Sequence, residues 1–89
     1  MRRVHVRVRG RVQGVFFRAS CVERARALRL AGWVRNTLDG GVDAEFQGDD
    51  GAVAAMIAWC REGPTLAVVE RVEVRDIDPM DDEGFRVAP

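Results

Sequence analysis

The sequence predicts an α+β fold in which two helices cover one face of an antiparallel sheet. Three observations support this prediction. Several short segments alternate hydrophobic and polar residues, as strands with one buried face do. Two longer segments between them repeat apolar residues at helical spacing. The resulting order, β-α-β-β-α-β with a short fifth strand, is the ferredoxin-like pattern, in which both helices pack on one side of the sheet.

The chain has 89 residues, of which 47% are hydrophobic and 31% charged, so we expect one globular domain, residues 1–89, with a single core. Its net charge is zero, which argues against a general nucleic-acid binder. No apolar run approaches the length of a membrane span, and no apolar stretch follows the charged N-terminus as in a signal peptide. We therefore expect a cytoplasmic monomer that binds neither nucleic acid nor membranes.

The first strand is predicted by alternation of valine with basic residues near the N-terminus. The valines are Val4, Val6, Val8 and Val12, and the basic residues are Arg3, His5, Arg7, Arg9 and Arg11. The valines should face the core and the basic residues should face water. We interpret His5 as a solvated strand residue rather than a catalytic one. The arginine stripe is open to two interpretations, an RNA-binding face or a solvated face balanced by neighbouring strands.

The segments that follow predict a helix and a hairpin. Residues 17–31 carry an apolar stripe at helical spacing, and Gly32 is a suitable residue to end that helix. Residues 33–37 and 42–47 are predicted strands. The Asp39-Gly40 pair between them is a favoured hairpin turn.

The second half of the chain predicts one more helix and two more strands. Asp49 or Asp50 should cap the helix, and Gly63-Pro64 should end it. Residues 67–77 alternate again and form the fourth strand. An acidic connection, interpreted as a solvated loop, leads to the short strand at residues 85–87.

The usual ferredoxin-like sheet places the first strand between the third and the fourth. The basic face of the first strand would then meet Asp43 and Glu45 on one side and Glu73 on the other. Opposite charges on neighbouring strands stabilise a sheet modestly. We therefore favour the structural interpretation of the arginine stripe over an RNA-binding face, which should also carry aromatic residues on its middle strands.

Two cysteines, Cys21 and Cys60, lie on helices that should run antiparallel, so a disulfide is conceivable. In a cytosolic protein the default is two reduced, buried thiols. Neither cysteine has metal-ligand spacing, and His5 is the single histidine, so we expect no metal site.

A glycine-containing loop, residues 10–18, joins the first strand to the first helix. Gly10 and Gly14 allow backbone N–H groups to converge, and a helix N-terminus adds unpaired N–H groups and partial positive charge. Arg18 adds a planar cationic fork, so the parts suit a phosphate group. The loop lacks the GK[ST] ending of a nucleotide P-loop. The alternative is an ordinary strand–helix turn with a surface arginine.

Two stretches resemble the signatures of a known family, the acylphosphatases. Residues 10–18 read Gly-Arg-Val-Gln-Gly-Val-Phe-Phe-Arg and are similar to the family pattern GxVQGVxFR. Residues 32–42, with Gly48 beyond them, are similar to the second signature, and Gly63-Pro64 with Ala67 and Val69 fits a third family pattern. The resemblance covers nearly the whole chain. It departs at the end, where Val87-Ala88-Pro89 replaces an Arg-Tyr-like pair.

The resemblance implies an enzyme, an acylphosphatase, that hydrolyses acyl phosphates to a carboxylate and orthophosphate without metal or cofactor. It implies that Arg18 binds the phosphate and that Asn36 orients the attacking water. The phosphate cradle implied by the motif is formed by backbone N–H groups of Gln13, Gly14, Val15, Phe16, Phe17 and Arg18. The partner would be a small-molecule acyl phosphate, and no residue selects a particular one.

The absence of a nucleophilic side chain from these motifs is consistent with that chemistry. The leaving carboxylate has a conjugate acid of pKa about 4 and departs without a proton. Asn36 is neutral and suits holding water, while the substrate phosphate is the candidate base. A competing hypothesis is a module that binds without catalysing, similar to the N-terminal domain of a hydrogenase-maturation carbamoyltransferase.

Overall fold

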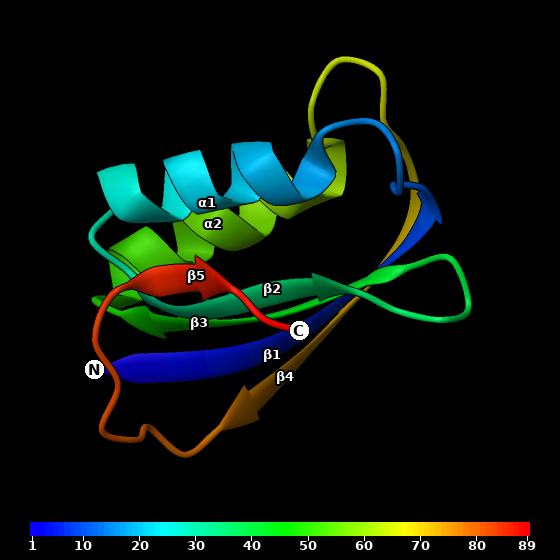
Figure 1. Cartoon of the computed structure of the whole chain (residues 1–89). Coiled ribbons are helices and arrows are strands. Elements are labelled where there is room, and N and C mark those ends of the chain that lie inside the picture. Colours follow the sequence, from blue (N-terminus) through cyan, green and yellow to red (C-terminus); the bar gives the residue numbers. More distant parts are fainter.

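A computed structural model describes the whole chain, residues 1–89, as a sheet with both helices on one face (Figure 1). In chain order the elements are β1 (Arg2–Arg11), α1 (Phe17–Ala27), β2 (Ala31–Asn36), β3 (Val42–Gly48), α2 (Asp50–Glu62), β4 (Val68–Ile77) and β5 (Phe85–Val87). The strand order is β4-β1-β3-β2-β5, which confirms the predicted place of the first strand. Neither helix is long and apolar enough to cross a membrane.

The short last strand makes the sheet mixed. The pairs β1–β3, β1–β4 and β2–β3 are antiparallel, as predicted, but β5 lies parallel to β2 at the edge of the sheet. The alternation of residues 85–87 predicted a strand without indicating its neighbour. The parallel pairing follows from the connection after β4, which returns the chain to the end of the sheet where β2 begins (Figure 1).

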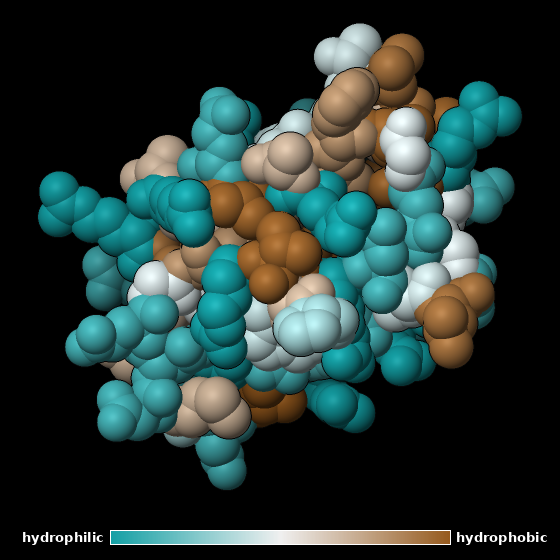
Figure 2. Space-filling view, viewed as in Figure 1, coloured by the Kyte–Doolittle hydropathy of each residue, from teal (hydrophilic) through white to brown (hydrophobic).

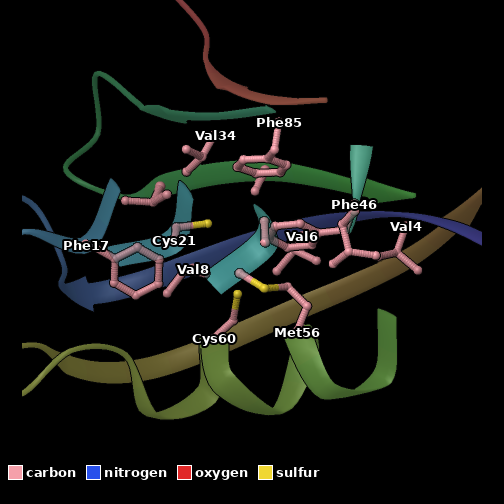
Figure 3. Packing of buried hydrophobic residues seen from close by; sticks show 14 of the residues in the cluster. Val4, Val6, Val8, Phe17, Cys21, Val34, Phe46, Met56, Cys60 and Phe85 are labelled. Atoms are coloured by element: carbon pink, nitrogen blue, oxygen red, sulfur yellow. The ribbon is translucent and has the colours of Figure 1, made fainter. Parts of the chain in front are cut away.

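The core lies between the sheet and the two helices (Figure 3). Val4, Val6 and Val8 are fully buried, as the alternation of β1 predicted. Cys21 of α1 and Cys60 of α2 are both buried free thiols in this core. Burial raises the pKa of both, that of Cys60 to about 12, so they are poor nucleophiles near neutral pH.

The predicted end of the first helix is wrong. Helix α1 ends at Ala27 and not at residue 31, because Arg29 adopts a left-handed conformation (φ 58°) that turns the chain into β2. Gly32 lies inside β2 instead of ending the helix, at a place where a Cβ would come within 1.9 Å of the Glu45 carbonyl oxygen. Asp49 precedes α2 as predicted, but its side chain makes no capping hydrogen bond.

The open face of the sheet is less solvated than the alternation of β1 predicted. Arg3 is 1% exposed, because the connection after β4 folds over it and its guanidinium pairs with Glu45 and Asp82. His5 is also largely covered, with Nδ1 2.9 Å from a Glu45 carboxylate oxygen. Arg7 does lie opposite both Asp43 and Glu73, so the predicted charge balance across strands is present.

Candidate active site

The loop between β1 and α1, residues 12–16, is shaped by unusual backbone conformations. A bulge interrupts the pairing of β1 with β4 between Arg9 and Gly10, and Gly10 lies so close to β4 that a Cβ would be 2.1 Å from the Val68 carbonyl oxygen. Gly14 (φ 73°) and Phe16 (φ 63°) are both left-handed. Glycine adopts this conformation freely, whereas a bulky residue such as phenylalanine does so at a cost.

This loop presents a row of unused hydrogen-bond donors. None of the backbone N–H groups of residues 14–18 donates to another group of the chain, and no side chain caps α1. The first turn of α1 contains no acidic residue, so nothing offsets the partial positive charge of the helix N-terminus there. Phe17 fixes this end of the helix, since its buried ring lies 5.1 Å from that of Trp59 on α2.

Gln13 attaches the loop to the turn between β2 and β3. Its side-chain amide donates to the carbonyl oxygens of Thr37 and Gly41, each at 2.8 Å. The turn is itself ordered by hydrogen bonds from Thr37 Oγ1 and the Gly41 N–H to Asp39. These bonds hold the pKa of the Asp39 carboxyl below its ordinary value. The hydrogen bonds of Gln13 thereby fix the position of the loop relative to the end of β2 that carries Asn36.

Arg18 and Asn36 line one cavity of about 460 Å³. Its walls are formed by Val12, Gly14, Phe16, Phe17, Arg18, Ala19, Asn36 and Val87. No acidic side chain lines it, and neither the Arg18 nor the Asn36 side chain has a hydrogen-bond or ion-pair partner within the chain. The β1–α1 loop and β2 thus reach the same site although β3 separates β1 from β2 in the sheet.

Most of the site residues predicted from the sequence line this cavity, but two of them do not. Gly14, Phe16, Phe17, Arg18 and Asn36 line it. The side chains of Gln13 and Val15 do not: Gln13 binds the β2–β3 turn, and Val15 belongs to the core.

Three lining residues were missed from the sequence: Val12, Ala19 and Val87. Ala19 lies one position after Arg18 in the first turn of α1, so its place beside Arg18 was a usable signal. No sequence signal pointed to Val87, because only the parallel pairing of β5 with β2 brings it to the cavity.

The fold and the cavity together define a class, a ferredoxin-like domain with a cavity beside a strand–helix loop whose N–H groups have no partner in the chain. Comparison with known proteins identifies the family. A family model described as acylphosphatase matches residues 4–87, and this chain belongs to the acylphosphatase family. It is 57% identical to an acylphosphatase of Rubrobacter xylanophilus over 75 residues, 84% of this chain and 68% of the relative.

Solved structures agree with this assignment. An acylphosphatase from Coxiella burnetii superposes with a TM-score of 0.94 at 39% identity, covering 98% of this chain and 92% of the other. An acylphosphatase from Bacillus subtilis gives a TM-score of 0.96 at 29% identity and covers both chains completely. The chain is accordingly a hydrolase that converts acyl phosphates to carboxylate and orthophosphate.

Proposed function

We propose that this hydrolysis proceeds by direct attack of water on phosphorus, with Arg18 and the loop N–H groups holding the phosphoryl group and Asn36 holding the water. The observation that supports this most strongly is that Arg18 and Asn36 face one cavity and that neither side chain has a partner in the chain. Four of the residues that line the cavity, Gly14, Phe16, Phe17 and Arg18, also carry backbone N–H groups with no partner in the chain. A phosphoryl group supplies the acceptors that these donors lack.

The proposed step forms a bond between the water oxygen and phosphorus and breaks the bond between phosphorus and the carboxyl oxygen. The carboxylate leaves with the bonding electron pair, and the water proton ends on the phosphate or in solvent. Phosphoryl transfer of this kind depends mainly on positioning and on stabilising charge on the equatorial oxygens. Arg18 and the N–H row supply that charge without needing to reorganise, because the loop is already shaped.

Asn36 suits the role of holding water because its amide both donates and accepts hydrogen bonds and stays neutral. It lies at the end of β2, where the hydrogen bonds from Gln13 to the adjacent turn fix its distance from the loop. An asparagine does not remove a proton from water. The phosphate of the substrate, whose oxygens are weakly basic, is therefore the base in this proposal.

The proposal is tested by hydrolysing benzoyl phosphate in water enriched in oxygen-18, with and without EDTA. Attack on phosphorus places the label in orthophosphate, and EDTA leaves the rate unchanged. Label in the benzoate would show attack on the carbonyl carbon and would overturn the proposed step. A folded chain that hydrolyses no acyl phosphate would instead favour a module that binds without catalysing.

We also infer that residues 1–89 act as a single monomeric domain in the cytoplasm. A single hydrophobic cluster unites the sheet and both helices, and both cysteines are free thiols, as in proteins of a reducing compartment. Light scattering after gel filtration tests the monomer, and fractionation of cells expressing the tagged chain tests the location. A dimer at low protein concentration or recovery outside the cytoplasm would refute the respective statement.

A further inference from the structure

We propose that Phe16 and Val87 form the acyl subsite of this cavity and give the enzyme a preference for flat, apolar acyl groups over small or charged ones. This inference rests on the proposed placement of the phosphoryl group at Arg18. The acyl group then lies in the rest of the cavity. Its walls decide which acyl group fits.

Phe16 has a conformation and an exposure that folding does not explain. It takes a left-handed backbone (φ 63°, ψ 22°), yet glycine or asparagine would adopt this conformation more easily. Its side chain is 73% exposed, so the ring adds little to the core. A costly conformation that exposes an aromatic ring in the lining of a cavity indicates a role in binding.

Val87 reaches the cavity from a different element. Strand β5 pairs parallel to β2, with Val87 opposite Val34 and the Ala88 N–H bonded to the Val34 carbonyl oxygen at 2.9 Å. This pairing holds the half-exposed Val87 side chain at the cavity that Asn36 of β2 also lines. The wall formed by Phe16 and Val87 therefore combines the first loop of the chain with its last strand.

The cavity has one cationic side chain, Arg18, and a lining that is otherwise mostly apolar. Arg18 and Asn36 are the polar side chains of the lining, and Phe16, Val87 and their other neighbours are apolar or glycine. Once the phosphoryl group occupies Arg18, no second cation remains for an acyl carboxylate and no acid is present for an ammonium group. A volume of about 460 Å³ leaves room for an aromatic ring beyond the phosphate.

Phe16 is the one aromatic residue among the large hydrophobic side chains that are exposed at the surface. Figure 2 shows a face covered mostly by hydrophilic side chains, with hydrophobic ones gathered in a few separate patches. An aromatic acyl group placed against Phe16 would cover exposed apolar surface and gain stacking contact. An acetyl group is too small to make the same contact, and it gains less from the wall.

The test compares kcat/KM for benzoyl phosphate and acetyl phosphate in the unaltered chain, Phe16→Gly, Val87→Thr and the control Leu66→Ser. Phe16→Gly relieves the left-handed strain while removing the ring, so we expect it to fold. We expect the benzoyl-to-acetyl ratio to fall about tenfold in Phe16→Gly and about threefold in Val87→Thr, mostly through benzoyl phosphate. Leu66 is 65% exposed and lines no cavity, so its substitution should leave the ratio unchanged.

The outcomes distinguish this inference from the proposed function. A benzoyl-to-acetyl ratio that stays unchanged in both Phe16→Gly and Val87→Thr would overturn the acyl subsite, whether or not both rates fall. Hydrolysis itself would still stand. If the unaltered folded chain hydrolyses neither substrate, the proposed function fails and the subsite fails with it.

Discussion

Arg18 projects from the first turn of α1 with no carboxylate beside it and with unused N–H groups on the preceding loop. An arginine in this position offers two parallel N–H bonds to a phosphoryl group, whereas a lysine offers a point charge. We expect Arg18→Ala to abolish detectable hydrolysis of benzoyl phosphate, and Arg18→Lys to recover it poorly, remaining at least about a hundredfold below the unaltered chain. Steady-state kinetics measure both, and near-normal activity in Arg18→Lys would contradict the bidentate role.

Asn36 should act on the rate and not on phosphate affinity. If it holds water, Asn36→Ala lowers kcat by about a hundredfold and leaves the inhibition constant of inorganic phosphate within about twofold. The matched variant Asn36→Asp keeps the shape but adds negative charge beside the phosphoryl group, so it should weaken phosphate binding as well. Loss of phosphate affinity in Asn36→Ala with unchanged kcat would show that Asn36 binds phosphate instead.

At the scale of elements, the bulge in β1 determines where the chain leaves the sheet and enters the β1–α1 loop. We expect Gly10→Ala to lower the free energy of unfolding by about 3 kcal/mol, because the added methyl meets the Val68 carbonyl and the left-handed backbone resists it. Gly51→Ala is the control. That glycine lies in α2 with open space around it, so alanine should raise the same free energy by about 0.5–1 kcal/mol. Urea melts compare the two, and equal effects would remove the special role of Gly10.

Most of the helices and strands could be predicted from local sequence patterns. The errors lie where contacts between residues far apart in the sequence determine burial or the end of an element. The alternation of β1 predicted the buried valines but not the burial of Arg3, which depends on Asp82 from the connection after β4. Helical spacing continued past Ala27, although the tertiary turn at Arg29 ends α1 earlier. Arg18 and Asn36 could be predicted as candidate site residues because each lies in a contiguous motif. Val87 could not, because it reaches the cavity only through the pairing of β5 with β2.

At the scale of the molecule, ionised groups on the open face of the sheet make the free energy of unfolding depend on pH. Burial alone would raise the pKa of Glu45, but hydrogen bonds from His5 and Arg3 together with their charges hold it below its ordinary value of 4.5. A carboxyl group whose folded-state pKa is lowered stabilises the fold fully above its unfolded pKa. This stabilisation is lost as the pH falls through the folded value.

We therefore expect the free energy of unfolding to decrease as the pH falls below about 4.5, and to decrease less steeply in Glu45→Gln. Urea melts between about pH 7 and about pH 3 measure both slopes. Glu83→Gln is a suitable control, since that exposed carboxyl has no ion pair in the structure. Identical acid slopes in Glu45→Gln and the unaltered chain would show that the network around Arg3 does not govern acid stability.

The hydrogen bonds of Gln13 to Thr37 and Gly41 carry a consequence for motion. Local opening of the β1–α1 loop breaks these bonds, so the loop and the β2–β3 turn should open as one cooperative unit in hydrogen exchange. Phosphate bound to the loop should then slow exchange of the Gly41 amide, which lies outside the cavity. In Gln13→Leu this remote protection should disappear while the loop amides remain protected, so that the two segments fluctuate independently.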